Sequence, residues 1–256
     1  MRPGQTFVIA LAMLSVVSCN DSSKQAQPER HPFLDGFEVD TAVWTPAQGI
    51  TRFGSNEGTL GIPASGGDHY AEVQNQVDGY QTGYGDAGHS FYGGKGTEYL
   101  GDFYQAIDVY IDATWDPPAV PSVPAFWIDM TPHHADPANY GAEHNFQLTA
   151  TGSQVDVTVD GQASPIASIT SSGWTNFLMT FEKGAAADDP VVTRMLVRNA
   201  QHDILGQAAV AATSPGGPFQ SQDLLGNGYV WITVWQNGFG GDVLGIDNLE
   251  SGLLPY

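Results

Sequence analysis

The sequence predicts an all-β protein: a single antiparallel β-sandwich. Two observations lead to this prediction. Apolar and polar residues alternate with a period of two along much of the chain, and 31 glycines and 16 prolines punctuate the 256 residues. Alternation is typical of half-buried strands, and glycine and proline mark the turns between them. No convincing helical period or internal repeat accompanies this pattern.

Each expected strand corresponds to one alternating segment, and Asp160-Gly161 gives a strong hairpin signal. About a dozen strands in roughly 220 residues predict two sheets packed face to face, with a jelly roll favoured over an immunoglobulin-like or barrel arrangement. The glycine-rich residues 79–102 predict a long surface loop. The expected strands from residue 103 onward are 103–112, 125–130, 143–148, 155–159, 163–170, 175–182, 191–198, 206–212, 229–236 and 243–249.

The N-terminus has the pattern of a signal peptide over residues 1–18, with Arg2 followed by an apolar run. The run ends in Val16-Val17-Ser18-Cys19, which resembles the lipobox of bacterial lipoproteins. This resemblance implies cleavage before Cys19, its lipidation and a lipid-anchored, extracytoplasmic place in the cell envelope. Residues 19–33 then form a flexible stalk and 34–256 one folded domain. The alternative is an ordinary secretory signal with an incidental cysteine.

The charge balance restricts the possible partners. The chain has 28 acidic and 8 basic side chains, a formal net charge of −20. Proteins that bind DNA or RNA need a basic surface to neutralise phosphates, so nucleic acid is excluded as a partner. A dense polyanion such as a uronate polymer is a poor match for the same reason. A neutral ligand is favoured.

Three segments carry a resemblance to a known group of proteins: GFEVDTAVWTPAQGITRFGSNEGTLGIPASGGDHYAEV, GDFYQAIDVYID and LGIDNLE. They resemble bacterial exported proteins with a concanavalin A-like jelly-roll domain. Carbohydrate-binding modules and several polysaccharide hydrolases and lyases share that architecture. The resemblance implies the fold and a tendency to contact glycans, and it assigns no reaction.

The same resemblance implies a structural calcium site between an early acidic residue, Glu38 or Asp40, and Asp247 near the C-terminus. Calcium takes six to eight oxygen ligands, which carboxylates and turn carbonyls supply. The alternative is that these are solvated acids at strand ends.

A polar and aromatic face is the predicted ligand-binding surface. In 229–236 the β-branched residues suit the core, so the aromatic residues that alternate with them must face away from it. The same alternation places Trp127, Asn145 and Gln147 away from the core. Aromatic rings with a few polar groups fit the apolar faces and hydroxyl rims of sugars. The alternatives are aromatics buried beneath loops, or inverted faces. The predicted ligand-binding residues are Trp127, Asn145, Gln147, Tyr229, Trp231 and Trp235.

An enzyme on the same fold is the alternative function. Glycoside hydrolysis needs two carboxylates across the bond, and Asp129 and Glu143 could form a cross-strand pair, with Glu182 a third candidate. A lyase could use Tyr140 and His144 as proton-transfer groups. Parity also allows His144 to be a core-edge histidine, and the spacing of His133, His134 and His144 lacks a transition-metal motif.

Together these patterns predict an envelope lipoprotein whose calcium-stabilised jelly roll binds neutral polysaccharide. A polysaccharide hydrolase or lyase is the first alternative. A structural or protein-binding envelope lipoprotein is the second.

Overall fold

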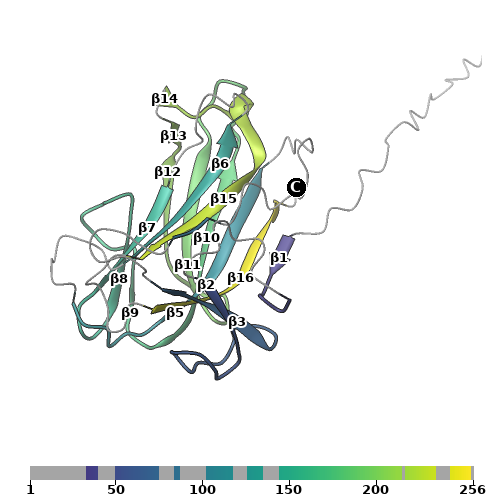
Figure 1. Ribbon diagram of the computed structural model, residues 1–256. Helices are drawn as coiled ribbons and strands as arrows, with labels where there is room; N and C mark the ends of the chain where they lie inside the picture. Colours follow the sequence, from purple (N-terminus) through teal and green to yellow (C-terminus); the bar gives the residue numbers. More distant parts are fainter. Residues whose placement is uncertain are drawn as a thin grey trace, which may run out of the picture. The chain divides into compact units, whose positions relative to one another are not determined.

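The computed structural model describes residues 33–39, 50–74, 84–86, 102–117, 126–134, 144–214, 217–234 and 243–254. Their strands form two antiparallel sheets that stack as a β-sandwich of jelly-roll type (Figure 1). The predicted fold class is therefore confirmed. In the described part of the chain, no helix has the length and apolar character needed to cross a membrane.

The first sheet, called the large sheet, has eight strands, and the last strand of the chain lies in its interior between β5 and β3. In spatial order its strands are β12 (Ile204–Ala211), β11 (Val192–Asn199), β10 (Gly173–Glu182), β5 (Phe103–Ile111), β16 (Val243–Leu253), β3 (His69–Gln74) and β2 (Ile50–Gly54), with β1 (Phe33–Asp35) paired to β16.

The second sheet, called the small sheet, has six strands. Their spatial order is β4 (Tyr84–Asp86), β15 (Leu224–Val234), β6 (Phe126–His134), β7 (His144–Ala150), β8 (Val155–Val159) and β9 (Ala167–Ile169). A short pair, β13 (Thr213–Ser214) and β14 (Gly217–Pro218), and a 3₁₀ turn at Ser221–Asp223 precede β15.

The core lies between the two sheets and consists mainly of alternate residues of their strands. Phe146 of the small sheet meets Phe177 of the large sheet at 5.2 Å between ring centroids, and Phe103 stacks on Phe181 at 4.8 Å. All four side chains are completely buried. Because strand side chains alternate between faces, the residues between them point outward on either side of the sandwich.

Most of the expected strands are found, with shifted ends. β9 is shorter than the predicted 163–170, and β15 begins earlier than the predicted 229. The predicted turn is present, with φ of 47° at Asp160 and 69° at Gly161. Strands β1 to β4 are not among the expected strands, and the short β4 lies within the expected loop 79–102. The predicted signal peptide, Cys19 and the stalk up to residue 32 lie outside the described residues.

The two sheets approach each other closely where β12 meets β9. A Cβ atom on Gly206 of β12 would lie 2.0 Å from the backbone oxygen of Ile166, just before β9. Only glycine permits this contact without a shift of the backbone. Gly206 therefore lets the sandwich close on this side.

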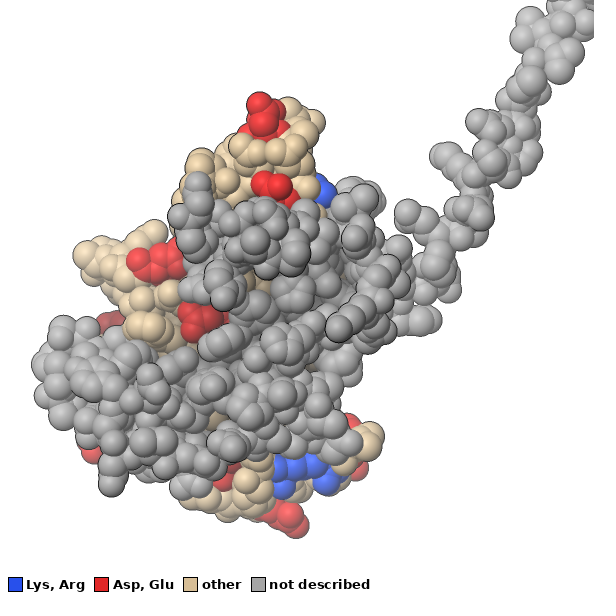
Figure 2. Space-filling model, turned by 45° about the horizontal axis from the view of Figure 1, so that its top comes forward, with Lys and Arg blue, Asp and Glu red and all other residues tan. Residues whose placement is uncertain are grey.

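Charged groups are few and spread out. On the face drawn in Figure 2, acidic side chains are dispersed over the described surface instead of forming one patch. Among the basic residues, Arg194 and Arg198 lie on β11, in the large sheet. The small-sheet strands β6 to β9 contribute no lysine or arginine to the described residues.

Candidate functional site

Four of the predicted site residues lie on the outer face of the small sheet: Trp127, Asp129, Asn145 and Gln147. All four are partly exposed. The residues that alternate with them are completely or almost completely buried against the core, for example Ile128 and Phe146. The parity argument from the sequence is therefore confirmed for β6 and β7.

The pairing of β6 with β7 arranges these four side chains in two neighbouring rows. Asp129 lies opposite Asn145, and Trp127 lies opposite Gln147. Directly opposite Cβ atoms in such a pair are about 4.5–5.5 Å apart. The Gln147 Nε2 donates a hydrogen bond of 2.8 Å to the Asn145 Oδ1, which links the two rows. The rows form a compact set of one aromatic, one acidic and two amide side chains.

The backbone of β15 extends both rows on the other side of β6. Trp231 is in register with Asp129, and Thr233 is in register with Trp127, while Tyr229 lies opposite Thr131. Only the backbone of Tyr229 and Trp231 is described. Trp235 lies outside the described residues. Positions 231, 129 and 145 thus stand in one row across three adjacent strands.

The register changes the prediction for the catalytic carboxylates. The residue opposite Asp129 on β7 is Asn145, so Glu143 is not its direct cross-strand partner. Glu143 and Tyr140 lie outside the described residues. Glu182, the third candidate, is on β10 in the other sheet, where it accepts a hydrogen bond of 2.7 Å from the Arg194 Nε. The described residues do not bring it together with Asp129.

His144 points to the core and not to the face that holds Asn145. Its side chain is only 4% exposed, and its Nδ1 lies 2.8 Å from the Asp160 Oδ2 in the turn after β8. Its Nε2 is buried and has no hydrogen-bond partner within the described residues. His144 therefore holds the position of a core-edge histidine, the alternative that parity allowed, and it does not share a face with Asp129. A catalytic role for His144 stays a prediction.

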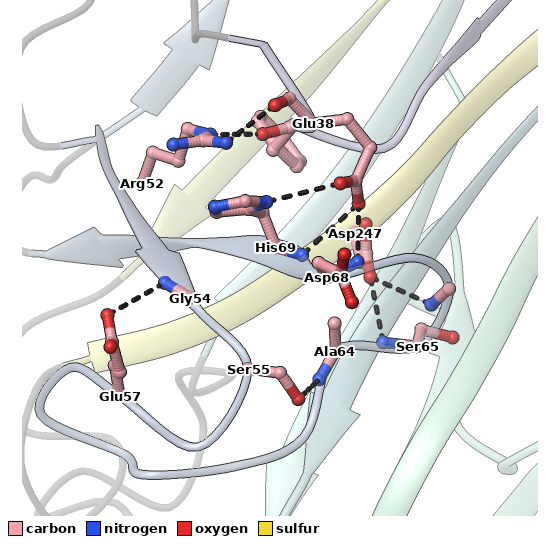
Figure 3. A network of polar contacts seen from close by, with 12 residues as sticks. Glu38, Arg52, Gly54, Ser55, Glu57, Ala64, Ser65, Asp68, His69 and Asp247 are labelled. Atoms are coloured by element: carbon pink, nitrogen blue, oxygen red, sulfur yellow. Dashed lines mark hydrogen bonds and ion pairs between the residues drawn. The ribbon is translucent and has the colours of Figure 1, made fainter.

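A different set of acidic residues holds residues 55–68, the segment between β2 and β3, which we call the clamp loop. Three carboxylates use the same device: each accepts hydrogen bonds from two consecutive backbone N–H groups. These are Glu72 with Thr59 and Leu60, Asp247 with Ser65 and Gly66, and Glu38 with Asp68 and His69, at 2.8–3.1 Å. Figure 3 shows Glu38 and Asp247 beside the end of the loop.

Asp247 is the most buried of these carboxylates, and it lies opposite Asp108 of β5. The Ser65 Oγ donates to the Asp108 Oδ2 at 2.7 Å, and the Asn248 Nδ2 donates to the same oxygen at 2.8 Å. Burial raises the pKa of Asp247 to about 7, against the lowering effect of the backbone N–H donors of Gly66, Asn248 and Ser65. Nearby Asp108 raises it further.

The contacts of Glu38 and Asp247 bear on the predicted calcium site. One oxygen of each carboxylate already accepts two N–H donors, so the acceptor sites of that oxygen are occupied and it has none left for a cation. No group of three or more His, Cys, Asp or Glu in the described ranges is placed to hold a metal. As placed here, these two residues do not fit calcium. Asp40 lies outside the described residues, and calcium binding stays a prediction for experiment.

The clamp loop could not be predicted from the sequence, because the residues that hold it lie far from it in the chain. Asp108 is recognisable as an outward position from the alternation of β5, but nothing in the sequence pairs it with Ser65 or Asn248. From the sequence alone, Glu72 and Asp247 could equally be solvent-exposed acids. Their burial follows only once the loop covers the outer face of the large sheet.

Searches with this chain found no matching family model and no matching curated protein. Solved structures with a similar fold include an alginate lyase of Aplysia kurodai, with 8% identity, 88% of this chain and 100% of that chain covered, and a TM-score of 0.48. An endo-β-1,4-glucuronan lyase of Trichoderma reesei has 8% identity, coverages of 87% and 95%, and a TM-score of 0.46. Lectin I-B4 of Griffonia simplicifolia has 8% identity, coverages of 88% and 100%, and a TM-score of 0.45. At these values the likeness decides nothing about what this chain binds.

Proposed function

We propose that this protein binds neutral polysaccharide on the outer face of the small sheet. The observation that carries the proposal is the register of β15, β6 and β7, which sets the predicted site positions in two adjacent rows. Residues separated by up to about a hundred positions in the sequence meet there, on one face, with the parity that the sequence predicts.

The chemistry of the described side chains suits an uncharged sugar. An indole ring offers an apolar surface to the C–H face of a pyranose, and carboxamides can donate to and accept from hydroxyl groups. Trp127, Asn145 and Gln147 supply these groups, and Asp129 supplies a further acceptor. We propose that Tyr229 and Trp231 of β15 complete the surface.

The electrostatics of this face support a neutral ligand over a uronate. The strands that carry the two rows have no lysine or arginine within the described residues, and Asp129 stands in the middle of one row. A polymer with one carboxylate per residue would place like charges together without a compensating base. We propose binding without cleavage as the primary activity, because the residue opposite Asp129 is the amide Asn145 and not a second carboxylate.

We also propose that the domain is held at the cell envelope through a lipid on Cys19. The support is the apolar run and Val16-Val17-Ser18-Cys19 of the sequence, whose cysteine is the single one in the chain. A lipid-anchored glycan-binding domain would keep polysaccharide close to the cell surface.

The test is a glycan-array screen of the full chain, followed by affinity measurements on the best neutral polysaccharide. The variant Gln147→Ala should weaken binding at least several-fold, because it removes a donor from the face and its bond to Asn145. The matched control Gln207→Ala removes the same group from β12 in the other sheet and should leave the affinity unchanged.

Two outcomes would overturn the proposal. One is the absence of binding to any neutral glycan on the array. The other is equal affinity of the wild-type protein and Gln147→Ala combined with Trp127→Ala, both confirmed as folded by circular dichroism. New reducing ends or an unsaturated product would instead support the hydrolase or lyase alternative, and would replace binding without cleavage as the primary activity.

A further inference from the structure

A pocket that plays no part in the site above lies where strands of the large sheet begin and end. The end of β9, the start of β10 and the connection between them form one wall, and the turn between β11 and β12 forms the other; together they line an open pocket of about 360 Å³. That volume is at the lower end of the range for small-molecule sites. The side chains that define its chemistry are Thr170, Ser171, Ser172, Trp174, Gln201 and Leu205.

Most of the pocket lining, residues 168–175, comes from the longest uncharged stretch of the sequence, and Leu205 comes from the second longest; Asn199, Ala200 and Gln201 belong to the turn between β11 and β12, which also contains Asp203. Residues 161–181 and 204–222 contain no acidic or basic side chain, although the protein has 36 of them. The two stretches are neighbours in space because β9 contacts β12. In a protein with a net charge of −20, an uncharged concave surface is where a neutral ligand meets the least electrostatic and desolvation cost.

Trp174 is held in a fixed position in the wall of this pocket. Its Nε1 donates a hydrogen bond of 2.8 Å to the backbone oxygen of Pro63 in the clamp loop. Its ring meets Tyr110 and Tyr70 edge-on, with centroid separations of 5.6 Å and 6.2 Å. A ring fixed in this way loses little conformational entropy when a ligand packs against it.

The polar groups of the pocket divide into two kinds. Ser168 and Ser172 donate to Asp156 at 2.6 Å and to Asp112 at 2.9 Å, so they hold the wall in shape. The side chains of Thr170, Ser171 and Gln201 make no hydrogen bond within the described part of the chain. They are exposed at the mouth and able to donate to and accept from a ligand.

We propose that this pocket is a second carbohydrate-binding site, which takes a single neutral sugar unit against Trp174. A rigid aromatic ring, uncharged hydroxyl and amide groups, and the exposed Leu205 match the mixed apolar and polar surface of a sugar. A charged sugar has no counter-ion in the lining. The pocket is separate from the rows around Asp129, because it shares no residue with them and takes only Ser168 and Ile169 of β9 from the small sheet.

The test follows Trp174 directly. The full chain is labelled with 5-fluorotryptophan, and its fluorine NMR spectrum is recorded during titration with glucose, galactose, mannose, N-acetylglucosamine and, for comparison, glucuronate. The signal that is missing in Trp174→Phe belongs to Trp174. We expect at least one neutral sugar to shift this signal in a saturable way, and glucuronate to shift it much less.

Two variants make the result specific to the pocket. Ser171→Arg fills the mouth with a bulky charged side chain and should abolish the shift. The control Ser153→Arg places the same side chain on the exposed turn before β8 and should preserve the shift. The proposal is overturned if no neutral sugar moves the Trp174 signal, or if Ser171→Arg responds like the wild-type protein. Gln147→Ala should leave the shift intact, so failure of the small-sheet site would be seen separately.

Discussion

Asp247 in the last strand accepts a hydrogen bond of 2.8 Å from the backbone N–H of Ser65, which precedes it by 182 residues. Asp247 is completely buried, and it lies in register with Asp108. This contact fixes the clamp loop to the middle of the large sheet. Its strength depends on the charge of one carboxylate, so it makes the stability of the domain sensitive to pH.

The first prediction concerns that pH dependence. Because the pKa of Asp247 rises from 3.8 to about 7 on folding, folding favours the protonated form. The contribution of Asp247 to stability is complete at pH values below its unfolded pKa of 3.8. It is lost as the pH rises through its folded pKa of about 7. Between about pH 5 and about pH 8, the wild-type free energy of unfolding should fall by roughly 2–3 kcal/mol more than that of Asp247→Asn.

Urea denaturation at the two pH values measures this difference. The variant Asp247→Asn will be less stable at every pH, because the new amide group faces backbone N–H donors. Only the change of stability with pH is therefore compared. Asp188→Asn, on an exposed turn, should keep the wild-type change. Identical pH dependence in the wild-type protein and Asp247→Asn would contradict the prediction.

The second prediction concerns the close contact of the sheets at Gly206. A Cβ atom there would lie 2.0 Å from the Ile166 oxygen and 2.7 Å from its carbonyl carbon, and backbone atoms cannot swing away as a long side chain can. Gly206→Ala should therefore lower the free energy of unfolding by about 1–3 kcal/mol or more. Gly61→Ala, at φ +60° with no atom within 4 Å, should lose only about 1–2 kcal/mol from backbone strain. Thermal denaturation that ranks Gly61→Ala as the more damaging change would refute this account.

The third prediction separates structure from catalysis at His144. Because His144 points to the core and contacts Asp160, His144→Leu should lower the free energy of unfolding by about 1–3 kcal/mol. The affinity of the folded variant for neutral glycan should be unchanged. Asp160→Asn keeps an acceptor and a residue that tolerates the positive φ of the turn, so it should be milder. Loss of binding or of product formation in folded His144→Leu would restore a functional role for this residue.

The fourth prediction concerns metal removal. Calcium bound at the predicted site should raise the melting temperature in millimolar calcium above that in EDTA, and equal melting temperatures would contradict the calcium prediction. A ligand that binds only the folded state must raise the melting temperature. A clear rise in calcium would support the sequence-based site and would mean that Glu38 and Asp247 exchange their N–H donors for the ion. The variant Glu38→Gln should abolish such a rise.

The sequence was sufficient to predict the fold class and the side chains of each strand that face the core. The reason is that burial between two sheets makes apolar and polar residues alternate with a period of two. This explains why Trp127 and Asn145 are found on the predicted outer face. Register follows from the pairing of whole strands and not from a local pattern. The partner of Asp129 was therefore not predictable, and Asn145 takes the position considered for Glu143.

The early strands escaped prediction for another physical reason. In β3, Glu72 is buried next to buried apolar residues. This is possible because its carboxylate accepts hydrogen bonds from backbone N–H groups of the clamp loop. A charged residue at a buried position breaks the expected pattern unless its distant hydrogen-bond partners are known. The pocket beside Trp174 likewise forms from two segments that only the packing of β9 against β12 brings together.

The position of β16 has a consequence for the order in which the domain is assembled. This strand, the last in the described chain, is inserted between β5 and β3 and also pairs with β1. During synthesis, β5 and β3 therefore emerge long before the strand that joins them. β3 can already pair with β2 and β5 with β10, but the edges of β3 and β5 that face β16 stay unpaired until this strand arrives, which makes truncation near the C-terminus far more damaging than its length suggests.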